Sequence, residues 1–295
     1  WISHYRTGGV GWESGRAGRA RQTGAVSTPD ISLPDDLLPG DGRFGCGPSK
    51  IRKDSFDMLI GSAGHFLGTS HRQAAVRFKV SELRNGLAEL FSLPDGYEVL
   101  LGNGGTTAFW DAATFGLIDS RSQHVQFGEF SSKFAKAAAA APHLGDPEVI
   151  STKPGHHPTA VPMDGIDAYC LTHNETSTGV AMPLERPHGT DGDALVLVDA
   201  TSAAGGLRFD AAQTDVYYFA PQKCLASDGG LWLAACSPAA IERIQRIAAS
   251  DRWIPAFFDL GIALENSRKD QTYNTPALAT LFLATEQVQW ILDNG

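Results

Sequence analysis

The chain has 295 residues, of which 42% are hydrophobic and 19% charged, so it can build the core of one large α/β domain or of two smaller ones. Its formal net charge of -9 argues against a general binder of nucleic acids or of anionic membranes. No apolar run in the sequence approaches the roughly 20 residues that a membrane-spanning helix needs.

Three parts are predicted along the chain. Residues 1–29 are rich in Gly and Arg, lack an apolar segment and do not begin with Met, which is not the pattern of a secretory signal. We interpret them as a disordered or non-native leader, in preference to a basic arm for nucleic acid. Residues 30–50, rich in Pro and Asp and ending in a Gly-Pro turn, form a predicted N-terminal arm. Residues 51–295 form one large predicted domain.

Four cysteines lie far apart in the sequence and show no paired metal-ligand spacing: Cys46, Cys170, Cys224 and Cys236. This usage predicts buried free thiols of a cytosolic protein. We therefore expect no metal site and a cytoplasmic location.

A long amphipathic helix is predicted soon after residue 70. Apolar side chains recur there at a spacing of three to four residues: Val76, Val80, Leu83, Leu87 and Leu90. Ser70 is the expected N-cap, which places His71 and Arg72 in the first turn, where backbone N–H groups and the helix dipole favour an anion. Arginine adds a planar fork suited to phosphate or carboxylate. The alternative is an arginine with a purely structural role.

A glycine-rich turn, residues 102–105, joins a predicted strand, 97–101, to a predicted helix, 108–118. With Thr106 and Thr107 at the helix N-terminus, the turn is typical of a phosphate cradle. It matches neither G-x-x-x-x-G-K-[ST] nor G-x-G-x-x-G, which weakens an interpretation as a nucleotide site.

Two further predicted strands end in turns with candidate site residues. The strand 123–127 is followed by Phe130, which offers a face for stacking on a planar ring, with simple packing as the alternative. The strand 168–172 is followed by a hydroxyl-rich turn that contains Thr176.

Two buried strands lead into groups of opposite charge. The strand 194–198 ends at Asp199, and the strand 216–219 leads into a turn with Gln222 and Lys223. Ligands of open α/β sheets bind beyond the carboxyl ends of the strands, so both groups are expected in one crevice. This pair suits pyridoxal phosphate, because the lysine forms a Schiff base and the acid keeps the pyridine nitrogen protonated. A structural Asp–Lys ion pair and a plain surface lysine are the alternatives.

Polar groups thus follow four predicted strands: Thr106, Thr176, Asp199 and Lys223. Unrelated structural roles would scatter such groups along the sheet, so their convergence predicts a shared site.

A set of short motifs, in this order, resembles the phosphoserine aminotransferase family, which belongs to class V of the pyridoxal-phosphate transaminases. The motifs are Gly-Pro-Ser (47–49), Ser-His-Arg (70–72), Gly-Gly-Thr-Thr (104–107), Asn-Glu-Thr (174–176), Asp199, Gln-Lys (222–223) and Asn-Thr-Pro (274–276). The resemblance runs from about residue 33 to residue 295 and is strongest to actinobacterial forms.

The resemblance implies the fold of the large domain of aspartate-aminotransferase-like enzymes. This fold is a three-layer α/β sandwich with a mostly parallel central sheet, and it would occupy residues 51–295 as the domain that binds pyridoxal phosphate. The family continues into a small C-terminal domain with further basic residues for the substrate. We therefore expect a C-terminally truncated chain that encodes cofactor binding but not complete catalysis.

The resemblance also implies roles around the cofactor. Lys223 would form the Schiff base and shuttle the proton between Cα and C4′, and Asp199 would pair with the pyridinium nitrogen. Gly105 and Thr106 would bind the cofactor phosphate, with Gln222 nearby.

Further cofactor contacts are implied on either side of the ring. Thr176 would contact the ring side, and Phe130 stands where many relatives stack a tryptophan. Asn274 and Thr275 would reach the cofactor phosphate of the other subunit of a homodimer.

The implied reaction moves the amino group of L-glutamate to 3-phosphohydroxypyruvate, giving O-phosphoserine and 2-oxoglutarate in serine biosynthesis. His71 and Arg72 would approach the substrate phosphate across the dimer interface. Many bacterial relatives have arginine in place of Thr106, so part of the anion recognition is expected to differ. A second role on 4-phosphohydroxythreonine, in pyridoxal phosphate synthesis, stays open.

The alternatives are other class V transaminases, of the alanine–glyoxylate or serine type, and an inactive cofactor-binding fragment. A nucleotide-binding oxidoreductase lacks its fingerprint and leaves Asp199 and Lys223 without roles. A cysteine desulfurase is disfavoured because no loop presents an obvious exposed nucleophilic cysteine.

Overall fold

A computed structural model describes residues 32–38, 45–189 and 193–295. The contacts of the chain divide it into two units, Trp1–Gly42 and Arg43–Gly295. In the first unit, the described residues contain a short 3-10 helix, Asp35–Leu37. The predicted leader, residues 1–29, and part of the predicted arm lie outside the described residues. All further elements belong to the second unit.

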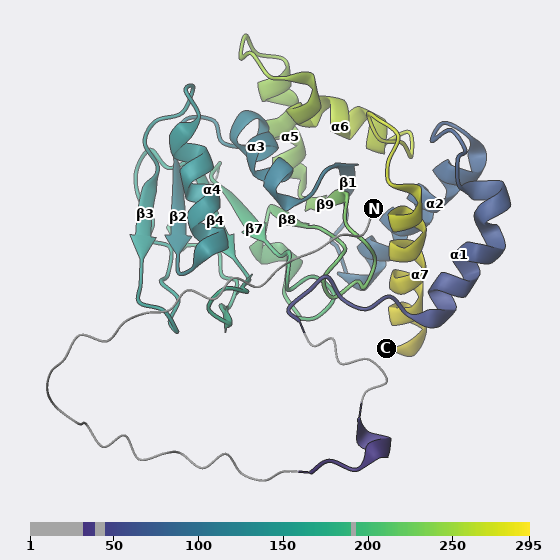
Figure 1. Cartoon of the computed structure of the whole chain (residues 1–295). Coiled ribbons are helices and arrows are strands. Elements are labelled where there is room, and N and C mark those ends of the chain that lie inside the picture. Colours follow the sequence, from purple (N-terminus) through teal and green to yellow (C-terminus); the bar gives the residue numbers. More distant parts are fainter. Residues whose placement is uncertain (1–31, 39–44, 190–192) are drawn as a thin grey trace, which may run out of the picture. The chain divides into compact units, whose positions relative to one another are not determined.

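A seven-stranded sheet forms the centre of the second unit (Figure 1). Its strands are β1 (Glu98–Asn103), β2 (Ser122–Gln126), β3 (Glu148–Ser151), β4 (Ala168–Thr172), β7 (Leu195–Asp199), β8 (Val216–Phe219) and β9 (Leu231–Cys236). They lie in the order β1-β9-β8-β7-β4-β2-β3. Strand β9 runs antiparallel to both its neighbours, and the remaining pairs are parallel. The expected mostly parallel sheet is confirmed. A small hairpin, β5 (Asn174–Glu175) with β6 (Val180–Ala181), follows β4.

The central strands are hydrophobic at nearly every position because helices cover both faces of the sheet. Successive side chains of a strand point to opposite faces. In β7, Val196 and Val198 join one core cluster, whereas Leu195 and Leu197 join the other. Because each face of β7 packs against its own core, the register of the strand is fixed. The position of Asp199, the last residue of β7, is therefore fixed as well.

Two helical layers enclose the sheet, as Figure 1 shows. One layer holds α1 (Lys53–Phe66), α2 (Ala74–Leu90) and α7 (Leu278–Asn294). The other holds α3 (Thr106–Gly116), α4 (Glu129–Ala140), α5 (Pro238–Ala248) and α6 (Leu260–Ser267). The expected three-layer α/β sandwich is confirmed. Among the helices of the described ranges, none has the length and apolar character needed to cross a membrane.

One prediction about a helix was wrong, and one helix was missed. Helix α2 begins at Ala74 with Gln73 as N-cap, so His71 and Arg72 precede the helix instead of lying in its first turn. Ser70 fails as the cap because its hydroxyl accepts from the backbone N–H of Arg72, at 3.3 Å, and closes a turn of its own. Helix α6 was not predicted; Asp259 caps it by accepting from the N–H of Gly261, at 2.8 Å.

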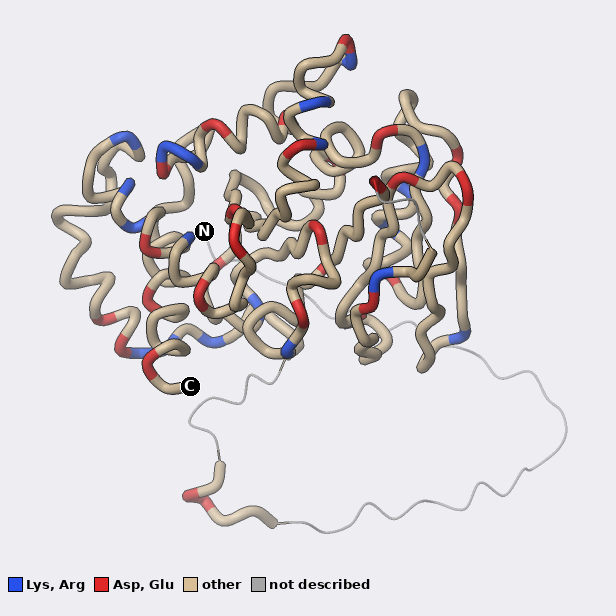
Figure 2. Tube along the Cα trace, turned by 180° about the vertical axis from the view of Figure 1, so that it is seen from behind, with Lys and Arg blue, Asp and Glu red and all other residues tan. Residues whose placement is uncertain are grey.

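The prediction of four buried thiols was also wrong in part. Cys170 and Cys236 are buried in the sheet, whereas Cys46 and Cys224 are exposed. Acidic and basic residues are interspersed along the trace of the second unit (Figure 2). Several form pairs that tie distant elements together, for example Lys79 with Glu286 at 2.8 Å, which joins α2 to α7.

Candidate active site

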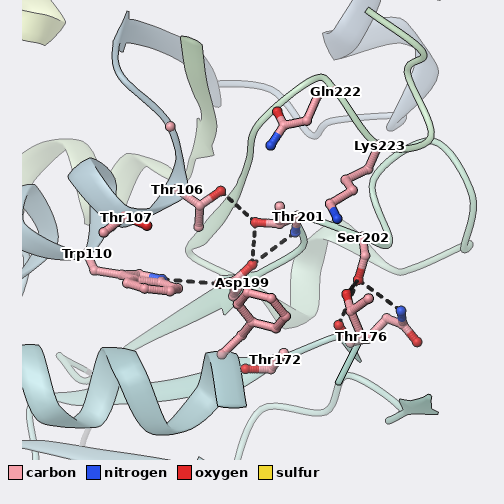
Figure 3. Close-up of a pocket in the computed structure, with 13 residues that line it drawn as sticks. Thr106, Thr107, Trp110, Thr172, Thr176, Asp199, Thr201, Ser202, Gln222 and Lys223 are labelled. Carbon is pink, nitrogen blue, oxygen red and sulfur yellow. Dashed lines mark hydrogen bonds between the residues drawn. The ribbon is translucent and has the colours of Figure 1, made fainter. Parts of the chain in front are cut away.

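A cavity of about 250 Å³ opens where β4 and β7 end and α3 begins. Figure 3 shows its residues, whose side chains come from separate strand ends and turn toward one space. Seven of the residues singled out in the sequence line it: Gly105, Thr106, Phe130, Thr176, Asp199, Gln222 and Lys223. The convergence of strand-end residues on one site is therefore observed. The role of each residue stays a prediction.

Asp199 ends β7 with both carboxylate oxygens held. The backbone N–H and the hydroxyl of Thr201 donate to Oδ1 at 2.9 and 2.6 Å, and the indole N–H of Trp110 donates to Oδ2 at 3.1 Å. Burial raises the pKa of Asp199 above its usual range, although the donors from Thr201 and Trp110 oppose that shift. A cationic group placed against this carboxylate would relieve the cost of its burial.

The sequence also allowed a purely structural ion pair between Asp199 and Lys223. Within the described residues, no salt bridge joins these two side chains. Lys223 is half-buried, and its Nζ donates to the backbone carbonyl of Cys46 at 3.3 Å. The amine therefore faces the cavity without being neutralised by the acid that shares it.

The turn that carries Lys223 is braced by the Gly-Pro turn near residue 47. The N–H of Ser49 donates to the carbonyl of Gln222 at 2.7 Å. Gly47 has a φ of 117°, and a Cβ there would lie 2.4 Å from Cδ of Lys223. Glycine is required at this position because both the backbone angle and the packed lysine stem exclude a side chain. The bracing restricts the directions in which the lysine can reach.

The N-terminus of α3 forms the end of the cavity that is suited to an anion. Gly104, with a φ of 109°, bends the chain out of β1, and Gly105 is the N-cap of the helix. The unpaired N–H groups of the first helical turn and the Thr106 hydroxyl face the cavity, which is a common arrangement for phosphate binding. Thr106 Oγ1 also lies 2.6 Å from Thr201 Oγ1, so this end is linked to the Asp199 end.

Phe130 stands at the first turn of α4, and Glu175 fixes that turn. Glu175 is fully buried, and its carboxylate accepts from the N–H and hydroxyl of Ser131, both at 2.9 Å, and from the hydroxyl of Ser177 at 2.7 Å. Burial opposes ionisation of Glu175, but these hydrogen bonds outweigh it and lower its pKa. The ring of Phe130 is thereby held at the cavity wall.

Thr176 and Asn174 are organised by Ser202. The Thr176 hydroxyl donates to Ser202 Oγ at 2.8 Å, and Asn174 Nδ2 donates to the same atom at 2.9 Å. Ser202 in turn donates to the Asn174 carbonyl at 2.9 Å. The turn after β7 therefore positions the turn after β4.

The remaining four predicted residues lie outside this cavity. His71, Arg72 and Thr275 line a second cavity of about 520 Å³, where His71 Nδ1 is 3.1 Å from Thr275 Oγ1. Burial, reinforced by the nearby charge of Arg72, lowers the pKa of His71. The backbone N–H of Asn274 donates to Asn103 Oδ1 at 3.4 Å. The structure thus separates a cluster around Lys223 from a cluster around Arg72.

Several cavity residues were not assigned a role from the sequence: Trp110, Thr172, Asn174, Thr201 and Ser202. Thr201 carries a local signal, because a threonine two residues after an aspartate can donate back to it. Trp110 carries none, since its contact with Asp199 depends on how α3 packs against β7.

The comparisons with known proteins agree with this architecture. The family model described as Aminotransferase class-V matches residues 149–291. A phosphoserine aminotransferase from Nocardioides is 64% identical over 269 residues, which is 91% of this chain and 72% of that relative. The corresponding protein of Corynebacterium glutamicum is 56% identical, over 90% of this chain and 70% of the relative.

A solved structure agrees as well. The chain superposes on a phosphoserine aminotransferase from Cytophaga hutchinsonii with a TM-score of 0.78 and 26% identity, over 84% of this chain and 70% of that one. The fold is that of a class-V aminotransferase. The chain belongs to the phosphoserine aminotransferase family. The resemblance drawn from the sequence motifs is confirmed at this level.

Proposed function

We propose that the chain binds pyridoxal phosphate in the cavity around Lys223 and Asp199. The observation that carries the proposal is Asp199: its side chain is 5% exposed and, in the described part of the chain, has no salt-bridge partner. Such a carboxylate is costly unless a cation joins it. A protonated pyridine ring supplies that cation, and the first turn of α3 suits the phosphate of the same molecule.

The predicted residues that line the cavity have distinct roles in this proposal. Gly105 and Thr106 would bind the phosphate, with Gln222 beside it; the Gln222 Oε1 atom is buried and has no hydrogen-bond partner among the described residues. Asp199 pairs with the ring nitrogen, and Lys223 forms the covalent link to the cofactor. Once bound, pyridoxal phosphate supplies an electron sink for the bond-breaking at Cα of an amino acid.

Two side chains would contact the ring. Phe130 would stack on its face, and Thr176, held by Ser202, would contact the ring side. The Lys223 amine would also take up the proton from Cα of the substrate. The bracing of its turn by Gly47 keeps the amine within reach of that atom.

The substrates follow from the family. The enzyme transfers the amino group of L-glutamate to 3-phosphohydroxypyruvate, giving O-phospho-L-serine and 2-oxoglutarate. His71 and Arg72 bind the substrate phosphate, and Asn274 and Thr275 reach the cofactor phosphate, in each case in the site of the partner subunit of a homodimer. Their separation from the Lys223 cavity supports this division, because one chain alone keeps the two clusters apart.

The domain assignment and location belong to the same proposal. Residues 51–295 act as the cofactor-binding large domain, preceded by an arm, residues 30–50, and the enzyme works in the cytoplasm. The net charge of -9 and the interspersed surface charges (Figure 2) favour neither nucleic acid nor an anionic membrane as a partner.

The test is to trap the cofactor. The protein is mixed with pyridoxal phosphate, reduced with borohydride and digested, and the labelled peptide is mapped. In the wild type we expect a visible absorption band and a label on Lys223, and in Lys223→Ala we expect neither. Lys53→Ala, at an exposed lysine, is the matched control and should behave like the wild type. A label elsewhere would refute the site.

Substrate profiling tests the reaction. Glutamate should bleach the band and 3-phosphohydroxypyruvate should restore it, whereas glyoxylate should not. Restoration by glyoxylate alone would favour an alanine–glyoxylate enzyme. A bound cofactor that ignores glutamate would favour a cofactor-binding chain without transaminase activity.

A further inference from the structure

Trp110 lies behind the carboxylate of Asp199, on the side away from Lys223 (Figure 3). Its indole N–H donates to Asp199 Oδ2 at 3.1 Å, and the side chain is 4% exposed. Thr201 occupies Oδ1 through two donors. The donor on Oδ2 therefore comes from α3, the helix whose N-terminus forms the anion end of the cavity.

We infer that Trp110 is a positioning residue that keeps Asp199 ionised, so that the proton shared with the bound cofactor stays on the ring nitrogen and not on the carboxylate. This inference rests on the proposed function. It assigns to Trp110 an electronic task that acts through Asp199, without contact between Trp110 and the reacting atoms.

The chemistry of the indole explains why Trp110 favours the ionised form of Asp199. Indole Nε1–H is a donor and has no acceptor, so its hydrogen bond to a carboxylate is stronger than its hydrogen bond to the protonated acid and favours ionisation. The direction of the donor is fixed, because the ring stacks on Phe134 with centroids 6.3 Å apart and planes at 14°. In a buried site such a hydrogen bond to a charge is stronger than in water.

The other groups around Asp199 work against ionisation. Burial is the largest cause of the raised pKa of Asp199, and the negative charge of Glu175 adds to it. On β8, Tyr217 and Tyr218 carry neutral phenols; burial raises the pKa of both, and the negative charge of Asp199 adds to that shift. The donors from Thr201 and Trp110 oppose these effects, and Lys223 is the one cationic residue among the described residues that line the same cavity.

The first experiment needs no cofactor. The carboxyl carbon of Asp199 is titrated by NMR in ¹³C-labelled protein, for the wild type, Trp110→Phe and Trp232→Phe. Trp232 is a matched control, since it is also 4% exposed and packs in the same core, 5.1 Å from Phe109. We expect Trp110→Phe to raise the proton affinity of Asp199 about tenfold, the effect of one hydrogen bond to a charge. A titration identical to that of Trp232→Phe would overturn the inference.

The second experiment uses ¹⁵N-labelled pyridoxal phosphate. In Trp110→Phe the chemical shift of the ring nitrogen should move toward the neutral form, while the borohydride label stays on Lys223. A fully protonated ring in Trp110→Phe would count against the inference. Failure of the wild type to take up cofactor would refute the proposed function separately, and the carboxyl titration would still decide whether Trp110 controls Asp199.

Discussion

Two buried histidines should make the protein sensitive to mild acid. His124 in β2 is 1% exposed and His173 after β4 is 5% exposed. Burial lowers the pKa of His124 to about 3 and that of His173 to about 4. In the unfolded chain both should titrate near the ordinary value of about 6.5.

The sign and size of the effect follow from linkage. The pKa values of both histidines are lower in the folded protein than in the unfolded chain, so the unfolded chain binds more protons. The stability is therefore fully present above the unfolded pKa and is lost as the pH falls from there toward the folded pKa values. Between pH 7 and pH 5, each histidine should lower the free energy of unfolding by about 2 kcal/mol. Asp199, whose pKa is raised, works in the opposite direction.

Urea unfolding at the two pH values separates these contributions. His124→Gln keeps a polar group that can bond Ser122, the present partner of His124 at 3.0 Å, and removes the titration. The loss of stability between pH 7 and pH 5 should shrink by about 2 kcal/mol in His124→Gln and likewise in His173→Gln. The exposed His65 changed to Gln is the control for the substitution itself. If both buried variants keep the acid sensitivity of the wild type, the reasoning is wrong.

Three further substitutions test the site. Thr201→Val keeps the shape but removes the hydroxyl that donates to Asp199, so cofactor affinity should fall about tenfold by fluorescence titration; unchanged affinity would make the hydroxyl dispensable. Glu175→Gln turns an amide group toward buried donors, so urea unfolding should show a free energy of unfolding lower by about 2 kcal/mol. An unchanged free energy would show that Glu175 does not hold the first turn of α4. Gly47→Ala should slow borohydride labelling of Lys223, because the added Cβ meets the lysine stem; wild-type labelling kinetics would show that the Gly-Pro turn does not position the amine.

Strand ends were the most predictable part of the molecule. A run such as residues 195–198 is short, apolar at every position and rich in Val, which favours a strand covered on both faces, with Asp199 at its end. The same reasoning placed Lys223 after β8. Parallel strands bring such residues to one edge without any knowledge of helix packing.

Contacts that depend on helix rotation were not predictable in this way. Trp110 reads as one more core aromatic in an apolar helix, and only the packing of α3 on β7 turns its N–H toward Asp199. The start of α2 was misplaced because Ser70 bonds locally to Arg72, and the side chain at the true cap, Gln73, makes no capping hydrogen bond. Local turns and helix caps compete for the same small polar residues.

The order of the strands also bears on synthesis at the ribosome. β1 pairs with β9, and the Lys223 amine meets a carbonyl 177 residues before it in the chain, that of Cys46. At roughly 5 to 20 residues per second, about 10 to 35 seconds separate the emergence of these two partners. In the same way, β1 has no partner on its β9 side until β9 has also emerged. The nascent chain therefore exposes an unpaired apolar strand until β9 is complete.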